Sequence, residues 1–366
     1  MPPLWEIITG RDCNLRCSYC YDHNHEARYN SPEQVEMFLR VAYADYLRGQ
    51  PQEAPQLCFI GGEPLLHTDL IDAALTFWHD FNRKHGLAEI RCSIVTNGTL
   101  IAGTGNVQKL LEKWGDKLRF SFSIDGTRKT HDACRVDAIG RGSWDKAIEG
   151  YKIAREFVGN AACRAKATFS RETVADYPYG VIELFEQGFR NVNANTVFEI
   201  CWRSEEAPYV YGLFRPIMDY LLAHGHYQSI KFKPLPTVLP ETGRMTMNQA
   251  CSCYQNGSMC LGLDGLVYGC HRMAVASKLH PHCKVTHDGF EDIAPELPQK
   301  GRDIWQERPE QCRSCMLGNV CYHCVNSIFE YDFDDLSAFH RAYSMCGWTK
   351  GVYAAQLEFL RRIQGH

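Results

Sequence analysis

Several features that mark other classes of protein are absent from this 366-residue chain. Lys and Arg form no basic stripe and the net charge is −4, which argues against nucleic-acid binding. No apolar run is long enough to cross a bilayer. Residues 1–6 have neither the basic nor the apolar region of a signal peptide. We therefore expect a cytoplasmic protein with no nucleic-acid partner and no membrane partner.

Cysteine, in contrast, is abundant. Eighteen cysteines in a cytoplasmic chain are not expected to form disulfides, because that compartment keeps thiols reduced. Three lie within residues 13–20 and ten within 251–346, which indicates metal ligation at both ends of the chain. The other five are isolated in apolar surroundings, where we expect them to act as small buried hydrophobic residues. These five are Cys58, Cys92, Cys134, Cys163 and Cys201.

Strand-like and helix-like segments alternate along the first half of the chain. Ser31-Pro32 is a typical helix start, and helical periodicity recurs between the later strands. This alternation predicts an α/β fold with a parallel sheet, in which the functional residues lie at the C-terminal ends of the strands. The predicted strands are 4–9, 57–60, 89–96, 117–124, 162–169 and 190–198.

We divide the chain into four parts on these patterns. Residues 1–198 hold the alternating strands and helices, and residues 199–250 form a bridging segment with a helix near 208–224. Residues 251–349 are rich in cysteine and are expected to be irregular. Residues 350–366 are expected to form a final helix.

Cys13, Cys17 and Cys20 form a CxxxCxxC loop directly after the first predicted strand. Three thiolates this close can converge on one metal centre, and a cubane iron–sulfur cluster held by three thiolates keeps one iron open. An open iron can bind a bidentate ligand and pass an electron to it. A structural zinc site is the alternative, but it takes four ligands, so His23 or His25 would have to complete it.

This loop, with Tyr19 before the last cysteine, resembles the signature loop of the radical S-adenosylmethionine (SAM) superfamily. The resemblance implies a partial (β/α)6 radical SAM barrel whose [4Fe-4S] cluster binds the amino and carboxylate groups of SAM. Electron transfer from the cluster would then cleave SAM to methionine and a 5′-deoxyadenosyl radical. An enzyme of radical chemistry is therefore expected.

Two further motifs follow the second and third predicted strands. Gly61-Gly62-Glu63-Pro64 resembles the family's GGEP motif, whose turn and glutamate meet the amino group of SAM. Asn97 lies where the family often contacts polar groups of SAM. An Asn-Gly pair also indicates a tight turn by itself, so both interpretations of Asn97 stay open.

The fourth predicted strand leads into another part of the resemblance. Ser123 and Asp125 belong to a stretch that is similar to the S-x-D-G motif of this branch, and they are candidates for SAM or substrate contacts. Arg135 follows, and its bidentate fork suits the SAM carboxylate. A surface or helix-capping role is the alternative for Arg135.

The C-terminal cysteines resemble the SPASM extension of radical SAM enzymes that modify peptides and proteins. The resemblance implies two auxiliary [4Fe-4S] clusters, each held by four cysteines, and therefore three clusters in the whole chain. The first auxiliary cluster would take Cys253, Cys260, Cys270 and Cys324. The second auxiliary cluster would take Cys312, Cys315, Cys321 and Cys346.

Some of these ligand assignments stay open. Cys251 competes with Cys253 for the first cluster. Cys321 and Cys324 are separated by two residues, where the family usually has three, and the two C-x-x-C pairs would also suit a zinc ribbon. Cys283 stands among histidines, but we expect it in a surface loop rather than at a metal.

The SPASM resemblance implies oxidative modification of a peptide, with an auxiliary cluster accepting the second electron. We expect a side-chain crosslink in a ribosomally made peptide. Sulfatase maturases typically carry Asp after the Gly-x4-Cys cysteine, where this chain has His271, a candidate base or a hydrogen-bonding residue. The alternatives are formylglycine formation, a small-molecule radical dehydrogenase and, as a non-enzyme, a zinc-stabilised binding module.

The same resemblance implies the partners. They are a peptide substrate and an electron donor such as flavodoxin or ferredoxin. Because the first strand begins at Leu4, we expect either a separate leader-peptide-binding protein or direct binding of the core peptide. Trp202 and the charged residues after it are candidates for the substrate entrance, with a solvated loop as the alternative.

Overall fold

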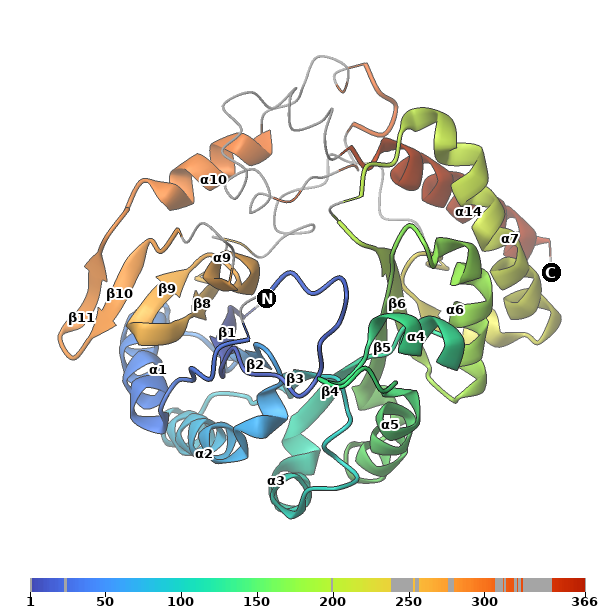
Figure 1. The fold of residues 1–366 in the computed structure, drawn as a ribbon. Helices are drawn as coiled ribbons and strands as arrows, with labels where there is room; N and C mark the ends of the chain where they lie inside the picture. Colours follow the sequence, from blue (N-terminus) through green and yellow to red (C-terminus); the bar gives the residue numbers. More distant parts are fainter. Residues whose placement is uncertain are drawn as a thin grey trace.

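The computed structural model describes residues 2–22, 25–198, 200–237, 253, 257–275, 280–306, 312, 314–318, 321, 324 and 344–365. Figure 1 shows a strongly curved sheet with helices along its outer side. The loop that follows the first strand lies over the inner side of this curve (Figure 1). None of the described helices is long and apolar enough to cross a membrane.

The described strands form one sheet in the order β11-β10-β9-β8-β1-β2-β3-β4-β5-β6-β7. Strands β1 to β7 run parallel to their neighbours, and β8 lies parallel to β1 on its other edge. The predicted parallel α/β sheet is therefore confirmed. The bounds are β1 Leu4–Ile8, β2 Gln56–Ile60, β3 Cys92–Thr96, β4 Leu118–Ser123, β5 Cys163–Phe169, β6 Asn191–Thr196, β7 Lys231–Phe232, β8 Met259–Leu261, β9 Leu266–Tyr268, β10 Cys283–Thr286 and β11 Gly289–Asp292.

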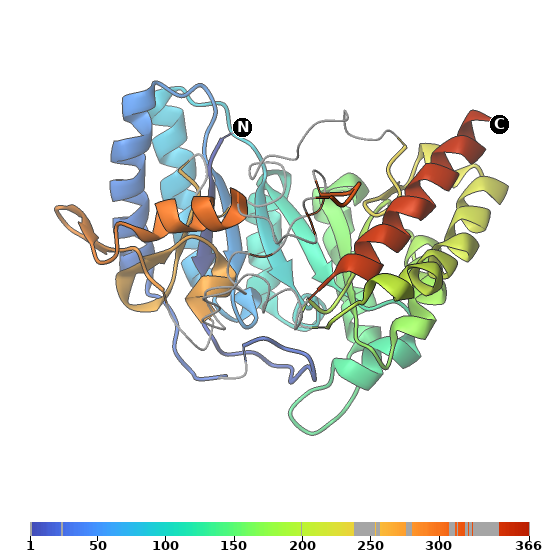
Figure 2. The ribbon, with the colours of Figure 1, turned by 90° about the horizontal axis from the view of Figure 1, so that it is seen from above.

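Local signals start and stop the helices where the sequence indicates. Ser31 caps α1 by accepting a hydrogen bond from the Gln34 backbone N–H at 3.2 Å, and Gly86 ends α2 with φ of +66°. The described helices are α1 Pro32–Tyr46, α2 Thr68–His85, α3 Gly105–Trp114, α4 Arg128–Cys134, α5 Trp144–Val158, α6 Tyr177–Glu186, α7 Ala207–Ala223, α9 His271–Val275, α10 Leu297–Gln306 and α14 Cys346–Gln364. In Figure 2 the last of these, α14, lies alongside α7.

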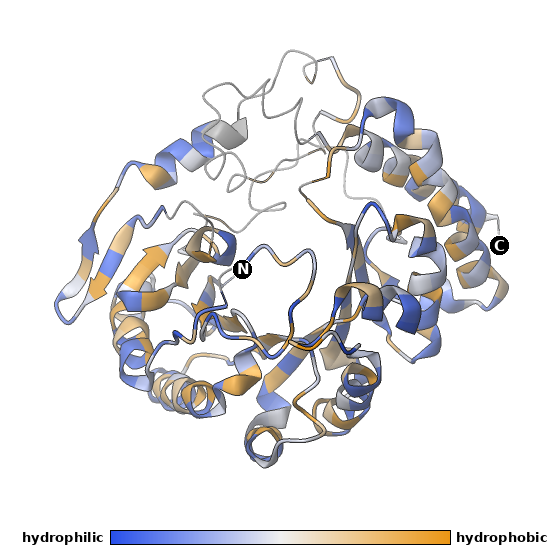
Figure 3. Cartoon of the chain, viewed as in Figure 1, coloured by the Kyte–Doolittle hydropathy of each residue, from blue (hydrophilic) through white to orange (hydrophobic). Residues whose placement is uncertain are grey.

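The two faces of the curved sheet differ in chemistry. On β5, Cys163, Ala165, Ala167 and Phe169 are fully buried in the hydrophobic core that joins the strands to the helices. The alternate residues of β4 and β5 face the other way, because side chains on a strand alternate between faces. These inner-face residues are Arg119, Ser121, Ser123, Arg164, Lys166 and Thr168. Figure 3 shows the corresponding mixture of hydrophobic and hydrophilic residues along the strands.

The region after residue 251 is more regular than its sequence suggests. Strands β8 to β11 extend the sheet beyond β1, and α9 and α10 lie in the same region. These strands have only three or four residues each, too few to show a period-2 pattern. Cys283 is 5% exposed in β10, so its expected place in a surface loop is wrong.

Four of the five isolated cysteines are buried as predicted, whereas Cys201 is only half-buried. Trp202, a candidate for the substrate entrance, is fully buried instead. Its ring lies 5.3 Å from that of Trp348 in α14, and the guanidinium of Arg171 lies 3.9 Å above it. Trp202 therefore joins the core between the barrel and the final helix.

Candidate functional site

The cysteine loop begins in close backbone contact with the end of β2. Gly62 N–H donates to the carbonyl of Gly10, and Glu63 N–H donates to that of Asp12, both at 2.9 Å. A Cβ on Gly62 would lie 2.1 Å from the Asp12 carbonyl oxygen, so only glycine permits this approach. Gly61 has φ of +145°, and a Cβ there would lie 2.3 Å from the Gly10 oxygen. The two glycines of the GGEP motif thus allow the start of the cysteine loop to pack directly against the backbone at the end of β2.

The rest of the loop is held from two other directions. On one side, the Arg16 and Ser18 backbone N–H groups donate to the carbonyls of Val136 and Cys134, at 2.6 and 2.9 Å. On the other, Asn97 donates from Nδ2 to Oδ1 of Asn14 at 2.8 Å. The C-terminal end of α4 with the residues after it, and the residue that follows β3, therefore fix the loop between them.

The three thiols of this loop are half-buried and influence one another. Burial, the nearby Glu63 carboxylate and, to a smaller extent, Cys17 and Cys20 together raise the pKa of Cys13 to about 12. Burial also raises the pKa of Cys17 and Cys20. Three thiolates in this place therefore need a bound cationic centre, and iron provides one. The donor set fits an iron–sulfur cluster.

A single metal ion fits less well. Zinc ligands must all lie about 2.1–2.3 Å from one point. Within the ranges given above, no three His, Cys, Asp or Glu side chains are close enough together to hold one ion. His23, one possible fourth ligand for zinc, lies outside the described residues.

Asp125 and Arg135 form a buried ion pair beside the loop. Arg135 donates from Nε to Oδ2 of Asp125 at 2.7 Å and from Nη2 to Oδ1 at 3.2 Å. Asp125 also accepts from the Thr168 backbone N–H at 2.8 Å and from the Tyr19 hydroxyl. The remaining Arg135 nitrogen, Nη1, lies 3.9 Å from Sγ of Cys17. Asp125 therefore orients Arg135, and the free edge of the guanidinium faces the cysteines.

Glu63 is 1% exposed and has a full set of partners. Its carboxylate accepts from the Leu65 N–H at 3.1 Å, the Thr96 hydroxyl at 2.7 Å and the Asn97 N–H at 2.8 Å. Burial raises the pKa of Glu63 to about 7, although these hydrogen bonds act in the opposite direction. The GGEP glutamate thus ties the end of β2 to the end of β3.

Ser123 ends strand β4, and His271 lies at the start of helix α9. Ser123 is half-buried, and within the described residues its hydroxyl makes no hydrogen bond. His271 begins α9, where its backbone N–H and its Nδ1 each lie 2.8 Å from an oxygen of Glu6 in β1. Burial alone would lower the pKa of His271, but the Glu6 carboxylate outweighs it and raises that pKa.

Three of the four cysteines predicted for the first auxiliary cluster lie close to α9. Cys253 and Cys260 are buried, and Cys260 and Cys270 interact electrostatically. A hydrogen bond with Cys253 lowers the pKa of Cys270 to about 7, despite burial. The competing Cys251 lies outside the described residues. Cys324 is half-buried, and its proposed membership stays a prediction.

The cysteines predicted for the second auxiliary cluster follow a hydrogen-bonded turn. Cys315 N–H donates to the Cys312 carbonyl at 3.3 Å, and Cys321 N–H donates to the Leu317 carbonyl at 2.8 Å. Sγ of Cys321 then lies 3.9 Å from Oγ1 of Thr349, in the first turn of the helix that begins at Cys346. This turn therefore brings the second set against the start of α14.

Three residues at the site were missed by the sequence interpretation. Glu6 positions His271, His131 accepts from the Asp125 N–H at 3.3 Å, and Lys166 lies on the inner face of β5. Glu6 and Lys166 are charged residues within short strands whose neighbours are apolar. This pattern is the signal that could have identified both.

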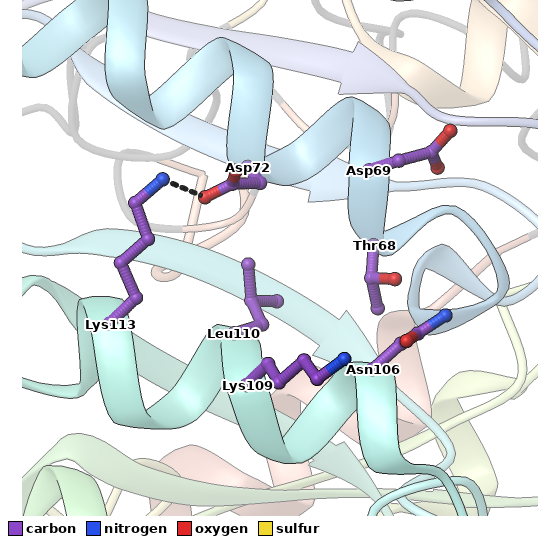
Figure 4. A pocket seen from close by; sticks show the side chains of 7 residues that line it. All are labelled: Thr68, Asp69, Asp72, Asn106, Lys109, Leu110 and Lys113. Atoms are coloured by element: carbon purple, nitrogen blue, oxygen red, sulfur yellow. Dashed lines mark ion pairs between the residues drawn. The ribbon is translucent and has the colours of Figure 1, made fainter.

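A separate groove of about 270 Å³ lies between the outer helices α2 and α3 (Figure 4). Lys113 and Asp72 form a 2.7 Å ion pair at one end of it. The groove contains none of the predicted site residues. Its lining residues are Thr68, Asp69, Asp72, Asn106, Lys109, Leu110 and Lys113.

Comparisons with known proteins agree with this geometry. Residues 7–164 match the family model of the radical SAM superfamily. The cysteine-type anaerobic sulfatase-maturating enzyme of Clostridium novyi is 28% identical over 154 residues, which are 40% of this chain and 38% of that protein. The chain spans 35% and 36% of the length of the next two relatives, both serine-type sulfatase-maturating enzymes of Klebsiella.

Two solved structures share the fold over most of the chain. Native anSMEcpe with bound AdoMet and Cp18Cys peptide has a TM-score of 0.73 at 18% identity, covering all of this chain and 99% of that one. Streptococcus suis SuiB bound to precursor peptide SuiA has a TM-score of 0.61 at 18% identity, covering 90% and 73%. The part of the chain that contains the cysteine loop, residues 7–164, is therefore similar to the radical SAM superfamily, and the described fold is that of the two solved structures.

Proposed function

We propose that this enzyme modifies a peptide oxidatively by radical chemistry, and that the product is a side-chain crosslink. The observation that carries the proposal is the cysteine loop itself. Cys13, Cys17 and Cys20 lie together at the C-terminal end of β1, with the oriented guanidinium of Arg135 beside them. This arrangement supports a cluster and an anionic ligand at the same place.

The residues of the loop have distinct proposed roles. Cys13, Cys17 and Cys20 would hold a [4Fe-4S] cluster, which supplies the electron that cleaves bound SAM. Arg135 would bind the SAM carboxylate, because its remaining N–H groups are free of Asp125 and point to the loop. Asp125 and Tyr19 would keep that guanidinium in place, and Glu63 would fix the strand ends on which SAM lies.

The C-terminal cysteines would complete the oxidation. Nine of them are described, and eight of these nine are the proposed cluster ligands. Four cysteines per cluster leave no iron open, so two auxiliary [4Fe-4S] clusters would transfer electrons rather than bind substrate. A flavodoxin or ferredoxin would reduce the enzyme, and the peptide would either bind directly through its core or be presented by a separate leader-peptide-binding protein.

A peptide substrate is supported by the two fold relatives, whose structures hold peptides. Formylglycine formation is the second candidate, because the matching relatives include sulfatase-maturating enzymes. The product distinguishes the two reactions. A crosslink removes two hydrogens and joins two residues, whereas formylglycine formation leaves an aldehyde on one Cys or Ser side chain.

The test uses anaerobically reconstituted enzyme with reductant, SAM and a co-expressed candidate peptide. We expect 5′-deoxyadenosine and methionine, and a peptide that has lost two hydrogens without gaining reactivity towards a hydrazide. A hydrazide-reactive product would instead establish formylglycine formation. Absence of SAM cleavage by the iron-replete enzyme would contradict both reactions.

A matched pair of variants tests the SAM contact. Arg135→Gln should weaken SAM binding about tenfold, because one charge-assisted hydrogen bond to the SAM carboxylate is lost. Arg128→Gln, at the other end of α4 and exposed to solvent, should leave SAM affinity unchanged. Equal affinities in the two variants would remove Arg135 from the SAM site.

A further inference from the structure

Lys166 occupies the middle of β5 and points to the inner side of the curved sheet. Its neighbours along the strand, Ala165 and Ala167, are fully buried on the outer face. In register, Lys166 lies between Ser123 of β4 and Asn193 of β6. Alternation gives all three residues the same face, so two uncharged hydrogen-bonding side chains flank the ammonium group.

The charged residues that interact with the Lys166 ammonium group come from both sides of the barrel interior. Lys166 interacts with Arg135 on one side and with Arg272, Cys58 and Glu6 on the other. It also acts on His271. Strands β1 and β5 are separated by three strands in the sheet, so Glu6 and Lys166 can approach only across the inner face. Lys166 therefore lies between the proposed SAM carboxylate contact and His271.

Two of the charged residues that act on Lys166 or are acted on by it already have a counter-charge. Arg135 is paired with Asp125, and His271 is paired with Glu6. Within the described residues, the Lys166 ammonium group makes no hydrogen bond and no ion pair. The surrounding protein lowers the pKa of Lys166, with desolvation as the largest cause, yet its side chain remains exposed. A ligand can therefore reach this cation, and a negative charge would stabilise it.

We propose that Lys166, assisted by the neighbouring Ser123 hydroxyl, binds a carboxylate of the peptide substrate. The inference rests on the proposed function and adds substrate chemistry to it. The enzyme would select a Glu or Asp side chain beside the residue that it modifies. Lys166 is then a specificity residue, and it takes no part in cleaving SAM.

SAM also carries a carboxylate, so the experiment must distinguish binding of the SAM carboxylate from binding of a substrate carboxylate. The substrate is favoured because Arg135 already faces the cysteine loop, whereas Lys166 lies further along the inner face, between Arg135 and His271. If Lys166 binds SAM, removing its positive charge should lower the affinity for SAM. A substrate-binding role would leave SAM affinity unchanged.

The probes are two acetylated and amidated pentapeptides, Ala-Ala-Glu-Ala-Ala and Ala-Ala-Gln-Ala-Ala. Their dissociation constants are measured anaerobically by calorimetry on reconstituted, SAM-bound enzyme. We expect the wild-type enzyme to bind the Glu peptide about tenfold more tightly, the effect of one charge-assisted hydrogen bond. Lys166→Met should abolish this preference, and Lys166→Arg should retain it. Lys109→Met, in the outer groove of Figure 4, is the matched control and should behave like wild type.

Iron content and SAM affinity are measured on the same samples. Unchanged SAM affinity in Lys166→Met, with the preference lost, is the expected result. The proposal is overturned if the wild-type enzyme shows no preference, or if Lys166→Met keeps it. A tenfold fall in SAM affinity in Lys166→Met would assign the cation to SAM and overturn the substrate assignment. SAM cleavage by wild-type enzyme is scored separately, so a failure of the proposed function is distinguishable from a failure of this inference.

Discussion

The two cysteine regions differ in how much of their geometry the protein supplies by itself. The loop from Cys13 to Cys20 is one continuous segment, fixed by backbone and side-chain hydrogen bonds from β2, β3 and the segment after α4. The described C-terminal cysteines come from separate pieces of chain, including β8, the residue before α9, the turn near Cys315 and the start of α14. The comparison indicates that protein groups alone organise the first site, whereas the second would depend more on the clusters proposed for it.

The largest expected effect comes from breaking the buried pair that supports the first site. Asp125→Asn leaves the Arg135 guanidinium buried without a counter-charge, which should cost about 3–5 kcal/mol of folding free energy. Chemical denaturation of the protein measures it. Asp145→Asn is the control, because it breaks the exposed ion pair with Arg128 and should leave the midpoint of the denaturation curve nearly unchanged. If both variants lost equal stability, the buried pair would not be the support that this account requires.

The next effect is a pH dependence that belongs to the first site. Burial lowers the pKa of His131 to about 4, below its value of 6.5 in the unfolded chain. As pH falls from 6.5 to 4, the unfolded state therefore takes up a proton that the folded state does not. Stability should fall by about 3 kcal/mol over this window. His131→Gln should remove this part of the slope, and an unchanged slope would contradict the assignment.

A smaller effect is expected from the glycine contact at the start of the loop. In Gly62→Ala the new Cβ meets the Asp12 carbonyl, and such overpacking costs about 1–3 kcal/mol. The variant should also lose iron from the first site and keep it in the C-terminal region. Gly103→Ala is the control, because a Cβ at Gly103 meets no atom within 4 Å. Full iron occupancy in Gly62→Ala would show that the loop tolerates displacement.

The smallest effect concerns the second region after iron is removed. We expect hydrogen exchange at the Cys315, Gly318 and Cys321 amides to rise about tenfold, equivalent to about 1.4 kcal/mol of local stability. The Gly62 and Glu63 amides should change less than twofold, since protein groups alone hold them. Hydrogen exchange measured by mass spectrometry, with and without iron, checks the expected change in each group of amides. An equal rise in the two places would abolish the distinction between the regions.

Much of the first site was predictable because its parts are local in sequence. The CxxxCxxC spacing, the glycine pair and the residues after each strand lie within short segments, and parallel strands bring their C-terminal ends to one edge. The structure accordingly places Glu63, Asn97, Asp125 and Arg135 around the cysteine loop.

The remainder depended on contacts that no local pattern encodes. The Glu6–His271 pair joins residues 265 positions apart, and only the pairing of β8 with β1 brings them together. Trp202 is followed in sequence by polar and charged residues, but α14 packs against it and buries it. Cys283 lies in a four-residue strand whose burial depends on its neighbours in the sheet. In each case long-range packing determines the environment.

The central claim is that Cys13, Cys17 and Cys20 hold the cluster that cleaves SAM, separately from the C-terminal clusters. The direct measurement is iron content and 5′-deoxyadenosine formation in the triple Ala variant, with Cys201→Ala as the control. Three clusters of four irons predict about twelve irons in the wild-type enzyme and about eight in the triple variant. The account predicts that the triple variant is brown, contains no zinc and does not cleave SAM. Undiminished SAM cleavage by that variant would contradict it.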